Sequence, residues 1–567
     1  MKILLLCSSF NGLTQRVWVE LRRAGHDVAW QQAVDDETVR AAVDLLDPDL
    51  VLCPFLRERV PDDVWRSRPT VIIHPGPVGD RGPSSLDWAI GGSETEWGVT
   101  ALSAVAAMDA GPVWATRTFT LTGEPVRKST LYGGPVTDAA VELAHEVVAK
   151  LGTPGFRPAV VDPARAPGRA RPGMTQADRR FSWADPTAHI LRRIRAADGS
   201  PGVRTQLAGA AVSVFDAQPG PARVDGVGTA EPGSVLRRSR GAVLVRTGDG
   251  SIWVGQARPV PGTPGLRVKL PAATLLGDRI ADVPEVLDGM GPREITYRRT
   301  GDVGVLTFDF YNGAASTGQC NRLATALRTA AAQDTRVLLL QGGATFCNGI
   351  HLGVIEAHPD PAAEAWRNIN AIDDACREII TCTRQLVVAA VGGNAGAGGV
   401  MLALGADRVL LRTGVVLNPH YRSMGLFGSE YWTYVLPRRV GRPRARRITT
   451  DCLPMGAQEA VEIGLADAVL PGDRARFDAA VVEHARALAA HPDLETWVAA
   501  KATARADDER RRPLETYLVR ELAEMSHDIF DDRNGFAATR HAFVTKQAAP
   551  PRTAGHDHAL QVAARVG

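Results

Sequence analysis

The sequence predicts a multidomain α/β protein. It begins with an open parallel sheet, continues with a small OB-like β domain, and ends with a second α/β unit that has a helical C-terminus. The chain has 567 residues, whereas a single hydrophobic core stops growing at about 250–300 residues. Apolar runs alternate with helical patterns towards both ends of the chain, and Pro/Gly-rich stretches set off a middle region of short β-type runs.

The first domain, predicted over residues 1–165, alternates apolar runs with amphipathic ones. We expect strands at 2–7, 28–30, 50–53 and 70–73, and helices at 15–24 and 39–46. Strands that alternate with helices indicate an open parallel sheet. Such sheets bind ligands at the carboxyl ends of their strands. His74 stands at one of these ends.

A stretch rich in Pro, Gly and Arg, GTPGFRPAVVDPARAPGRARPG at 152–173, predicts an extended linker. The β domain predicted after it, over residues 175–280, starts with a helix at 187–197. The runs AAVSVF, GAVLVRTGDGSIWVG and GLRVKL predict strands, and GDG at 248–250 is typical of a hairpin turn.

The third domain is predicted over residues 293–548. We expect strands at 303–308, 337–341, 386–391 and 408–411, a helix at 319–333, and a helical C-terminus. The tail, residues 549–567, is rich in Pro, Gly and His, and its composition predicts disorder.

Composition excludes several classes of function. The apolar fraction is 45%, the charged fraction 23% and the net charge +2, so the chain has no basic excess for nucleic acid or an acidic membrane. Seven dispersed cysteines without a CxxC pair argue against disulfides and against a metal site. The apolar run in MKILLLCSSF is too short for a signal peptide, and no run reaches the ~18 residues of a membrane span. We therefore expect a cytoplasmic protein.

The first candidate site joins His74 and Asp109, each at a predicted strand end. Pro75 and Gly76 turn the chain directly after the imidazole, and the loop continues through Arg81. A carboxylate beside an imidazole sets its tautomer and orients it as a general acid/base. The alternative interpretation is a structural His that caps a turn.

These segments resemble the folate-dependent formyltransferase family, which includes methionyl-tRNA formyltransferase. The match is carried by His74-Pro75, Arg81-Gly82-Pro83 and Asp109-Ala110-Gly111, and by FSWADPTAHILRRIRAADGSPGVRTQLAG for the family's C-terminal β domain. The resemblance implies formyl transfer from 10-formyl-tetrahydrofolate, with His74 and Asp109 catalytic and Arg81 binding the cofactor.

The family's catalytic Asn is missing, because its position holds Ile72. That Asn normally stabilises the oxyanion of the transfer intermediate. We expect Asn11 or Gln15, in SSFNGLTQR, to take its place at the cofactor.

The second candidate site is formed by GGATFCNGIHL at 342–352 and AAVGGNAGAGGVMLALGAD at 389–407. Each segment is a strand, then a Gly-rich loop, then a helix. Helix N-termini leave N–H groups unpaired, and two of them aimed at one point polarise a thioester carbonyl. The alternative for either loop alone is a tight-packing turn.

These loops resemble the motifs of the crotonase (enoyl-CoA hydratase/isomerase) superfamily, through Thr345–His351 and Gly393–Gly399. The resemblance implies a crotonase fold and a coenzyme A thioester as ligand. By alignment, the oxyanion N–H groups belong to Ile350 and Gly398, beside the cofactor-binding Gly349 and Gly399. Arg540 and Lys546, in FAATRHAFVTK, are the expected partners of the coenzyme A phosphates.

Both hydratase glutamates are absent, since their positions hold Met401 and His420. Glu430 is the remaining acid, in LFGSEYWTYVLPRRVG. Tyr421, Tyr431 and Trp432 would give it a partly apolar pocket and raise its pKa. We predict a catalytic role for Glu430 with these tyrosines. The alternative is a charge at a helix N-terminus, and His420 is either catalytic or structural.

The order of the two halves resembles the HypX (HoxX) family of hydrogenase maturation proteins. SSFNGLTQRVWVEL, HPGPVGDRGPSSLDWAI, MDAGPVW and GSEYWTYVLPRRVG carry the match. It implies formyl transfer from 10-formyl-tetrahydrofolate to coenzyme A, then decarbonylation of formyl-CoA to carbon monoxide and coenzyme A. NiFe-hydrogenase maturation proteins are the implied partners.

Two other functions remain open from the sequence. One is a bifunctional formyltransferase with an acyl-CoA hydrolase or isomerase. The other is a non-catalytic assembly factor that carries a one-carbon unit.

Overall fold

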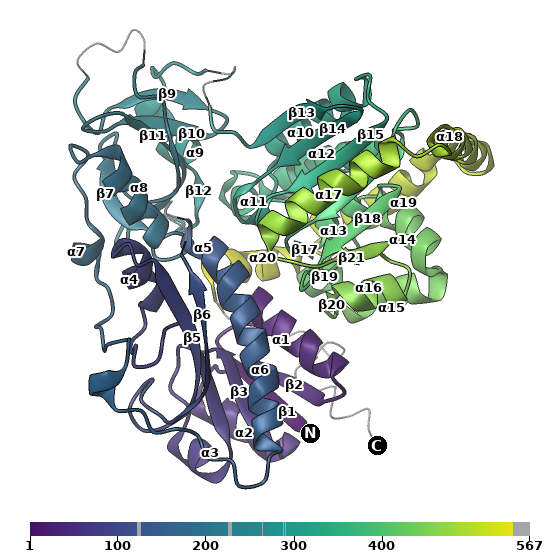
Figure 1. Cartoon of the computed structure of the whole chain (residues 1–567). Helices are drawn as coiled ribbons and strands as arrows, with labels where there is room; N and C mark the ends of the chain where they lie inside the picture. Colours follow the sequence, from purple (N-terminus) through teal and green to yellow (C-terminus); the bar gives the residue numbers. More distant parts are fainter. Residues whose placement is uncertain (122–125, 225–229, 264, 287–288, 290, 548–567) are drawn as a thin grey trace. The chain divides into compact units, whose positions relative to one another are not determined.

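The computed structural model describes residues 1–547 except 122–125, 225–229, 264, 287–288 and 290, so the predicted disordered tail lies outside the described residues (Figure 1). The chain divides into two compact units between Pro292 and Arg293. The predicted multidomain α/β fold class is confirmed. No helix in the described ranges combines the length and the apolar character needed to span a membrane.

The first unit opens with a six-stranded sheet in the order β2-β1-β3-β4-β5-β6. Its strands are β1 (Lys2–Cys7), β2 (Asp27–Gln32), β3 (Leu50–Phe55), β4 (Thr70–His74), β5 (Glu96–Ser103) and β6 (Val113–Thr120). The first four are parallel, as the predicted open parallel sheet requires, and β5 and β6 add an antiparallel edge for which no strand ranges were predicted. The alternating burial along β6 is typical of such an edge strand.

Helices flank this sheet: α1 (Gly12–Arg23), α2 (Asp36–Leu46), α3 (Asp62–Ser67), α4 (Ser85–Gly91), α5 (Lys128–Leu131) and α6 (Thr137–Leu151). Helix α1 begins before the predicted Gln15, because the Asn11 side chain accepts the N–H of Thr14 at 3.0 Å and caps the helix earlier. An ion pair between Arg16 and Asp138 joins α1 to α6.

A second, antiparallel sheet has the order β7-β8-β11-β10-β9, with β12 on β11. Its strands are β7 (Val203–Leu207), β8 (Ala210–Pro219), β9 (Val235–Ser239), β10 (Ala242–Arg246), β11 (Ser251–Pro259) and β12 (Leu270–Pro271). The predicted hairpin at 248–250 is confirmed between β10 and β11. The run GLRVKL was predicted to be a strand, but only its last residue, Leu270, lies in one. The core of this sheet takes in Ile190 and Ile194 from α8 (Thr187–Ala196), and short helices α7 (Gln176–Arg179) and α9 (Ala272–Leu276) complete this part.

The stretch 152–173, predicted as an extended linker, lies against the first sheet domain. Its backbone forms bridges from Ala159 to Val113 and from Ala170 to Arg81. A Cβ on Gly168 would lie 2.3 Å from the Asp80 N, so glycine permits this close approach. We call residues 157–173 the strap.

The second unit contains a sheet in the order β13-β14-β15-β16-β18-β21 and a small one in the order β17-β19-β20. These are β13 (Ile295–Thr300), β14 (Val303–Phe308), β15 (Val337–Gly342), β16 (Leu386–Val391), β17 (Ala395–Gly396), β18 (Arg408–Arg412), β19 (Val416–Asn418), β20 (Met455–Gly456) and β21 (Ala468–Leu470). The neighbours from β14 to β21 are parallel. The strands predicted in this unit are confirmed.

The helices of this unit are α10 (Thr317–Ala331), α11 (Leu352–Ala357), α12 (Pro361–Ile380), α13 (Gly398–Leu404), α14 (Trp432–Val440), α15 (Arg442–Asp451), α16 (Ala457–Glu462), α17 (Arg474–Ala489), α18 (Leu494–Arg511), α19 (Leu514–Ile529) and α20 (Phe536–Thr545). Phe477 and Val481 of α17 pack on one face of the large sheet. Residues of α10 and α12 form a core with the other face. The helical C-terminus is confirmed.

Candidate functional site

His74 is the last residue of β4 and is buried, with 5% of its surface exposed. The turn that follows holds the ring closely. A Cβ on Gly76 would lie 2.6 Å from His74 Nε2 and 2.3 Å from an Asp80 carboxylate oxygen. Only glycine fits this position, so the His-Pro-Gly sequence fixes the imidazole at the mouth of the sheet.

Two carboxylates hold the His74 ring. Nε2 lies 2.9 Å from Asp80 Oδ2, and Nδ1 lies 3.4 Å from Asp109 Oδ2. Asp109 also accepts the N–H of Gly82 at 3.1 Å, which anchors it to the same loop. The structure therefore brings His74 and Asp109 together. It adds Asp80, which the sequence analysis missed although it lies beside Arg81 in the same loop.

A cavity of about 800 Å³ opens in front of this His74 site. Its wall includes His74, Asp109 and Ile72, and also Asn11. Gln15 is turned away, with its Nε2 donating to the Phe10 carbonyl at 2.9 Å. Of the two residues expected to replace the missing Asn, the structure therefore places Asn11 at the cavity.

The Asn11 side chain has two partners: its Oδ1 caps Thr14, and its Nδ2 lies 3.5 Å from the Tyr132 hydroxyl. Arg81 lines a separate, smaller cavity of about 80 Å³ that also includes Asp80 and Asp109. Cofactor binding by Asn11, Gln15 and Arg81 stays a prediction.

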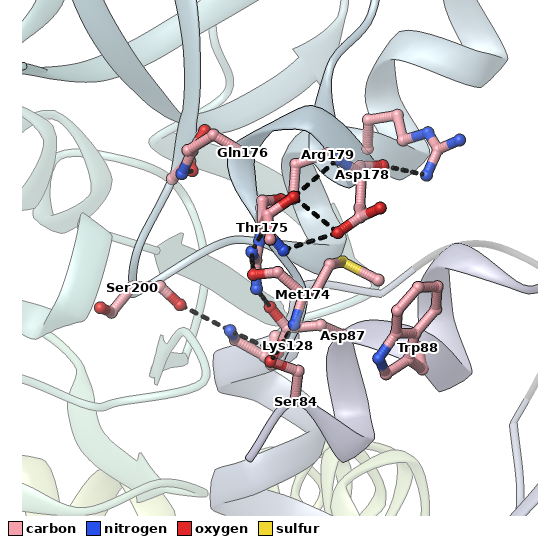
Figure 2. A network of polar contacts seen from close by, with 12 residues as sticks. Ser84, Asp87, Trp88, Lys128, Met174, Thr175, Gln176, Asp178, Arg179 and Ser200 are labelled. Atoms are coloured by element: carbon pink, nitrogen blue, oxygen red, sulfur yellow. Dashed lines mark hydrogen bonds and ion pairs between the residues drawn. The ribbon is translucent and has the colours of Figure 1, made fainter. Parts of the chain in front are cut away.

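A buried polar network forms another part of the large cavity's wall (Figure 2). Asp87 of α4 accepts from Lys128 Nζ at 2.9 Å and from Arg179 Nη2 at 2.6 Å. Lys128 also donates to the Ser200 carbonyl at 2.5 Å, and Met174 N–H donates to Ser84 Oγ at 3.0 Å. Burial lowers the pKa of Lys128. The network ties Met174, directly after the strap, to the N-cap residue Ser84 of α4, and it ties the loop that contains Ser200 to α4 through Lys128.

Asp80 is 2% exposed, and its Oδ2 lies within hydrogen-bond distance of His74 Nε2. Asp80→Asn should lower formyl transfer by roughly 10–100-fold, because an imidazole misplaced by about 1 Å transfers protons poorly. The measurement is the rate of tetrahydrofolate release from 10-formyl-tetrahydrofolate. Asp44→Asn, an exposed aspartate of α2, is the control. A transfer rate equal to wild type would contradict this positioning role.

In the second unit, the two Gly-rich loops meet. Gly349 has φ +76°, and a Cβ there would lie 3.3 Å from the Gly398 N. Gly398 begins α13, so its N–H has no partner within the helix. A Cβ on Gly399 would lie 2.0 Å from the Cys347 carbonyl oxygen. This contact requires glycine and brings the Ile350 and Gly398 loops together, as an oxyanion hole needs.

Glu430 lies directly against this helix start. A Cβ on Gly398 would lie 2.0 Å from Glu430 Oε1. The other oxygen, Oε2, accepts from the Tyr421 hydroxyl at 2.8 Å and from Ser429 N–H at 3.2 Å. Glu430 is 2% exposed, and burial raises its pKa to about 7. A carboxyl with this pKa exchanges protons readily near neutral pH.

The other predicted residues surround Glu430 less directly. His420 is half-buried, its Nδ1 lies 2.7 Å from the Asn418 carbonyl, and burial lowers its pKa. Its ring approaches the second Gly-rich loop, since a Cβ on Gly396 would lie 3.1 Å from Cε1. Tyr431 is buried and has φ +57°. Met401 is fully buried in α13, where hydratases have an acid.

The two predicted phosphate ligands differ. Arg540 is 6% exposed and its Nε lies 2.7 Å from Glu356 Oε2, so its charge is already balanced and phosphate binding is not favoured. Lys546 is exposed after the end of α20, with Nζ 4.5 Å from the centre of the Phe543 ring. Its role stays a prediction. Within the described part of the chain, no cluster of three or more His, Cys, Asp or Glu residues could hold a metal ion.

Comparison with known proteins gives matches to both halves. Residues 304–550 match the Enoyl-CoA hydratase/isomerase family, and residues 173–264 match the Formyl transferase, C-terminal domain, family. The methionyl-tRNA formyltransferase of Roseiflexus castenholzii is 32% identical over 251 residues, which cover 42% of this chain and 74% of that protein.

Two further similarities span nearly the whole chain. The hydrogenase maturation factor HoxX of Bradyrhizobium diazoefficiens is 44% identical over 565 residues, which cover 98% of this chain and 97% of that protein. The crystal structure of HypX from Aquifex aeolicus in complex with tetrahydrofolic acid has a TM-score of 0.92 and 37% identity, covering 98% of this chain and 97% of that one.

Proposed function

Because the chain belongs to the HoxX/HypX family of hydrogenase maturation factors, we propose that it synthesises carbon monoxide in two steps. The first step transfers the formyl group of 10-formyl-tetrahydrofolate to coenzyme A. The second splits formyl-CoA into carbon monoxide and coenzyme A. The observation that carries the proposal is Glu430, a buried carboxyl against the Gly398 helix start in a site where Met401 and His420 replace the hydratase acids.

The transfer step takes place in the large cavity of the first unit, whose volume of about 800 Å³ is typical of small-molecule sites. The thiol sulfur attacks the formyl carbon, the new C–S bond forms, and the C–N10 bond breaks. His74 takes the thiol proton and returns it to N10. Asp80 and Asp109 orient the ring and offset the positive charge that it carries between these transfers. The crystal structure of HypX from Aquifex aeolicus in complex with tetrahydrofolic acid supports a folate as a ligand of this chain.

The cleavage step takes place in the second unit. The N–H groups of Ile350 and Gly398 bind the thioester oxygen and polarise the formyl group. Glu430 takes the formyl C–H proton as the C–S bond breaks, and the thiolate takes that proton to give the free thiol. The products are carbon monoxide and coenzyme A, so the step is redox-neutral and needs no further reactant.

The transfer step is tested with the full-length protein, 10-formyl-tetrahydrofolate and coenzyme A, by following tetrahydrofolate and formyl-CoA chromatographically. We expect tetrahydrofolate to form only when coenzyme A is present. Its amount should exceed the coenzyme A supplied, because decarbonylation of the transient formyl-CoA regenerates coenzyme A. Equal tetrahydrofolate release with and without coenzyme A would exclude coenzyme A as the acceptor.

Gly398→Ala should lower carbon monoxide release by about 10²-fold, the usual effect of losing one oxyanion donor. The added Cβ would lie 2.0 Å from Glu430 Oε1, so either the helix start or the carboxyl must shift. Formyl transfer should not change. Gly318→Ala is the matched control, because its Cβ in the first turn of α10 would meet the Arg322 side chain at an ordinary 3.4 Å. Carbon monoxide release at the wild-type rate by Gly398→Ala would contradict the placement.

The two alternatives give different products in the same assays. A hydrolase in the second unit would give formate, and a non-catalytic carrier would give neither formate nor carbon monoxide. We propose NiFe-hydrogenase maturation proteins as the partners that receive carbon monoxide, and the cytoplasm as the location. Nucleic-acid binding and a resident metal form no part of the proposal.

A further inference from the structure

Three buried carboxyls gather around the turn that carries Glu430. Asp373 of α12 is 1% exposed, Glu430 is 2% exposed and Glu521 of α19 is 0% exposed. Asp373 and Glu521 come from helices far from Glu430 in sequence. The reaction proposed above uses neither of them, so a separate reason is needed for two buried acids at this place.

The turn itself has an unfavourable backbone. Glu430 has φ +60° and Tyr431 has φ +57°, so two consecutive residues with side chains occupy the left-handed region. Such a pair persists only where its surroundings hold it. This conformation is what directs the Glu430 carboxyl towards Gly398, on the same side as Tyr421.

Hydrogen bonds to the two extra acids hold this turn at both ends. Glu430 N–H donates to Asp373 Oδ1 at 2.6 Å. Three residues later, Thr433 donates to Glu521 Oε1 through its N–H at 2.7 Å and its hydroxyl at 2.5 Å. Neither acid touches the loop that contains Ile350 or the start of α13 in these contacts, so both act on the reacting groups only through Glu430.

We infer that Asp373 and Glu521 are positioning residues for Glu430: they hold the left-handed turn that presents its carboxyl to the Gly398 helix start. The inference rests on the proposed decarbonylation. In this inference the two acids accept hydrogen bonds and do not carry protons. A relay of three carboxyls would instead require them to exchange protons with Glu430.

The surroundings favour uncharged forms of both acids. Asp373 Oδ2 and Glu521 Oε2 are buried without a hydrogen-bond partner in the described part of the chain, which is costly for a carboxylate. Burial raises the pKa of Asp373 well above its usual range, and Glu430 and Glu521 raise it further; burial raises the pKa of Glu521 to about 8. Burial and, in addition, these carboxyls raise the pKa of the neighbouring Cys320, Cys347, Cys376, Tyr421 and Tyr431. Neutral acids hold the turn without placing a second negative charge beside Glu430.

The first test uses formyl-CoA supplied to the full-length protein, with carbon monoxide as the readout. Asp373→Ala should lower kcat by about tenfold or more, with KM changed little, because a misdirected carboxyl slows the proton transfer but not binding. Asp373→Asn keeps an oxygen that accepts the Glu430 N–H, and should restore most of the activity and leave the pH profile unmoved. Asp374→Ala, the exposed neighbour on the same helix, is the matched control and should behave as wild type.

Two results would overturn the inference. An unchanged kcat in Asp373→Ala would show that the contact does not position Glu430. An Asp373→Asn variant as slow as Asp373→Ala would mean that the acid exchanges a proton. Glu521→Ala and Glu521→Gln form a second pair of variants with the same expectations. This pair replaces the first in the test if Asp373→Ala fails to fold.

A crystal structure of Asp373→Ala separates this inference from the proposed reaction. We expect φ of Glu430 to leave the left-handed region and its hydrogen bond to the Tyr421 hydroxyl to be lost. An unchanged turn would overturn the inference, whatever the activity. If the wild-type protein releases no carbon monoxide, the proposed reaction fails, and these structures still decide whether Asp373 holds the turn.

Discussion

His74→Ala is expected to lower formyl-CoA formation by roughly 10²–10⁴-fold, the usual effect of removing a positioned acid/base. The imidazole is buried between Asp80 and Asp109 in the wall of the large cavity. The measurement is the initial rate of formyl-CoA formation from 10-formyl-tetrahydrofolate and coenzyme A.

The control for His74→Ala is the other reaction of the same protein. The variant should bind folate as the wild type does, and it should split added formyl-CoA at the wild-type rate, since Glu430 is in the other unit. Formyl-CoA formation within a few-fold of wild type would remove His74 from the mechanism and transfer the role to another group of the cavity.

Glu430→Gln is expected to lower carbon monoxide release by about 10²-fold or more, while formyl transfer and coenzyme A binding stay intact. The amide keeps the size of the side chain but cannot exchange a proton. Formyl-CoA should then accumulate without carbon monoxide, as measured by chromatography and by binding of the gas to reduced haemoglobin. Glu515→Gln, an exposed glutamate of the same unit, is the control. Unchanged carbon monoxide release would transfer the role to His420 or Tyr421.

The pH dependence of carbon monoxide release follows from the same group. Burial raises the pKa of Glu430 to about 7, so below this pH the carboxyl is protonated and cannot accept the formyl proton. The rate with supplied formyl-CoA should therefore rise as the pH passes through about 7, and the rise should disappear in Glu430→Gln. A rate independent of pH from 6 to 8 in the wild type would contradict Glu430 as the proton acceptor.

Local sequence patterns were sufficient for the buried parallel strands, the hairpin at 248–250 and the two Gly-rich loops, because apolar periodicity and glycine requirements act over a few residues. The antiparallel edge formed by β5 and β6 was missed, since pairing direction depends on the tertiary arrangement. The contacts that hold the strap against the first sheet domain were not predicted, because Pro and Gly favour an extended chain without indicating which surface it lies against.

The residues of the candidate sites show the same contrast between features set by local sequence and features set by tertiary contacts. His74, Asp109 and Glu430 belong to short motifs that a sequence displays directly. The groups that hold the Glu430 turn are not visible in such motifs. Asp373 reaches Glu430 and Glu521 reaches Thr433 across sequence separations of 57 and 88 residues, and no spacing rule connects them. The Lys128–Asp87–Arg179 network likewise joins three separate segments through long-range contacts.

The central claim is that the formyl carbon of the folate leaves as carbon monoxide. The direct measurement uses full-length protein, coenzyme A and 10-formyl-tetrahydrofolate labelled with heavy carbon in the formyl group, with the label followed by mass spectrometry of the gas phase and of formate. We expect labelled carbon monoxide in amounts equal to the tetrahydrofolate formed, and less by about 10²-fold or more from Glu430→Gln. Label that appears as formate, with no labelled gas from the wild-type protein, would contradict the account.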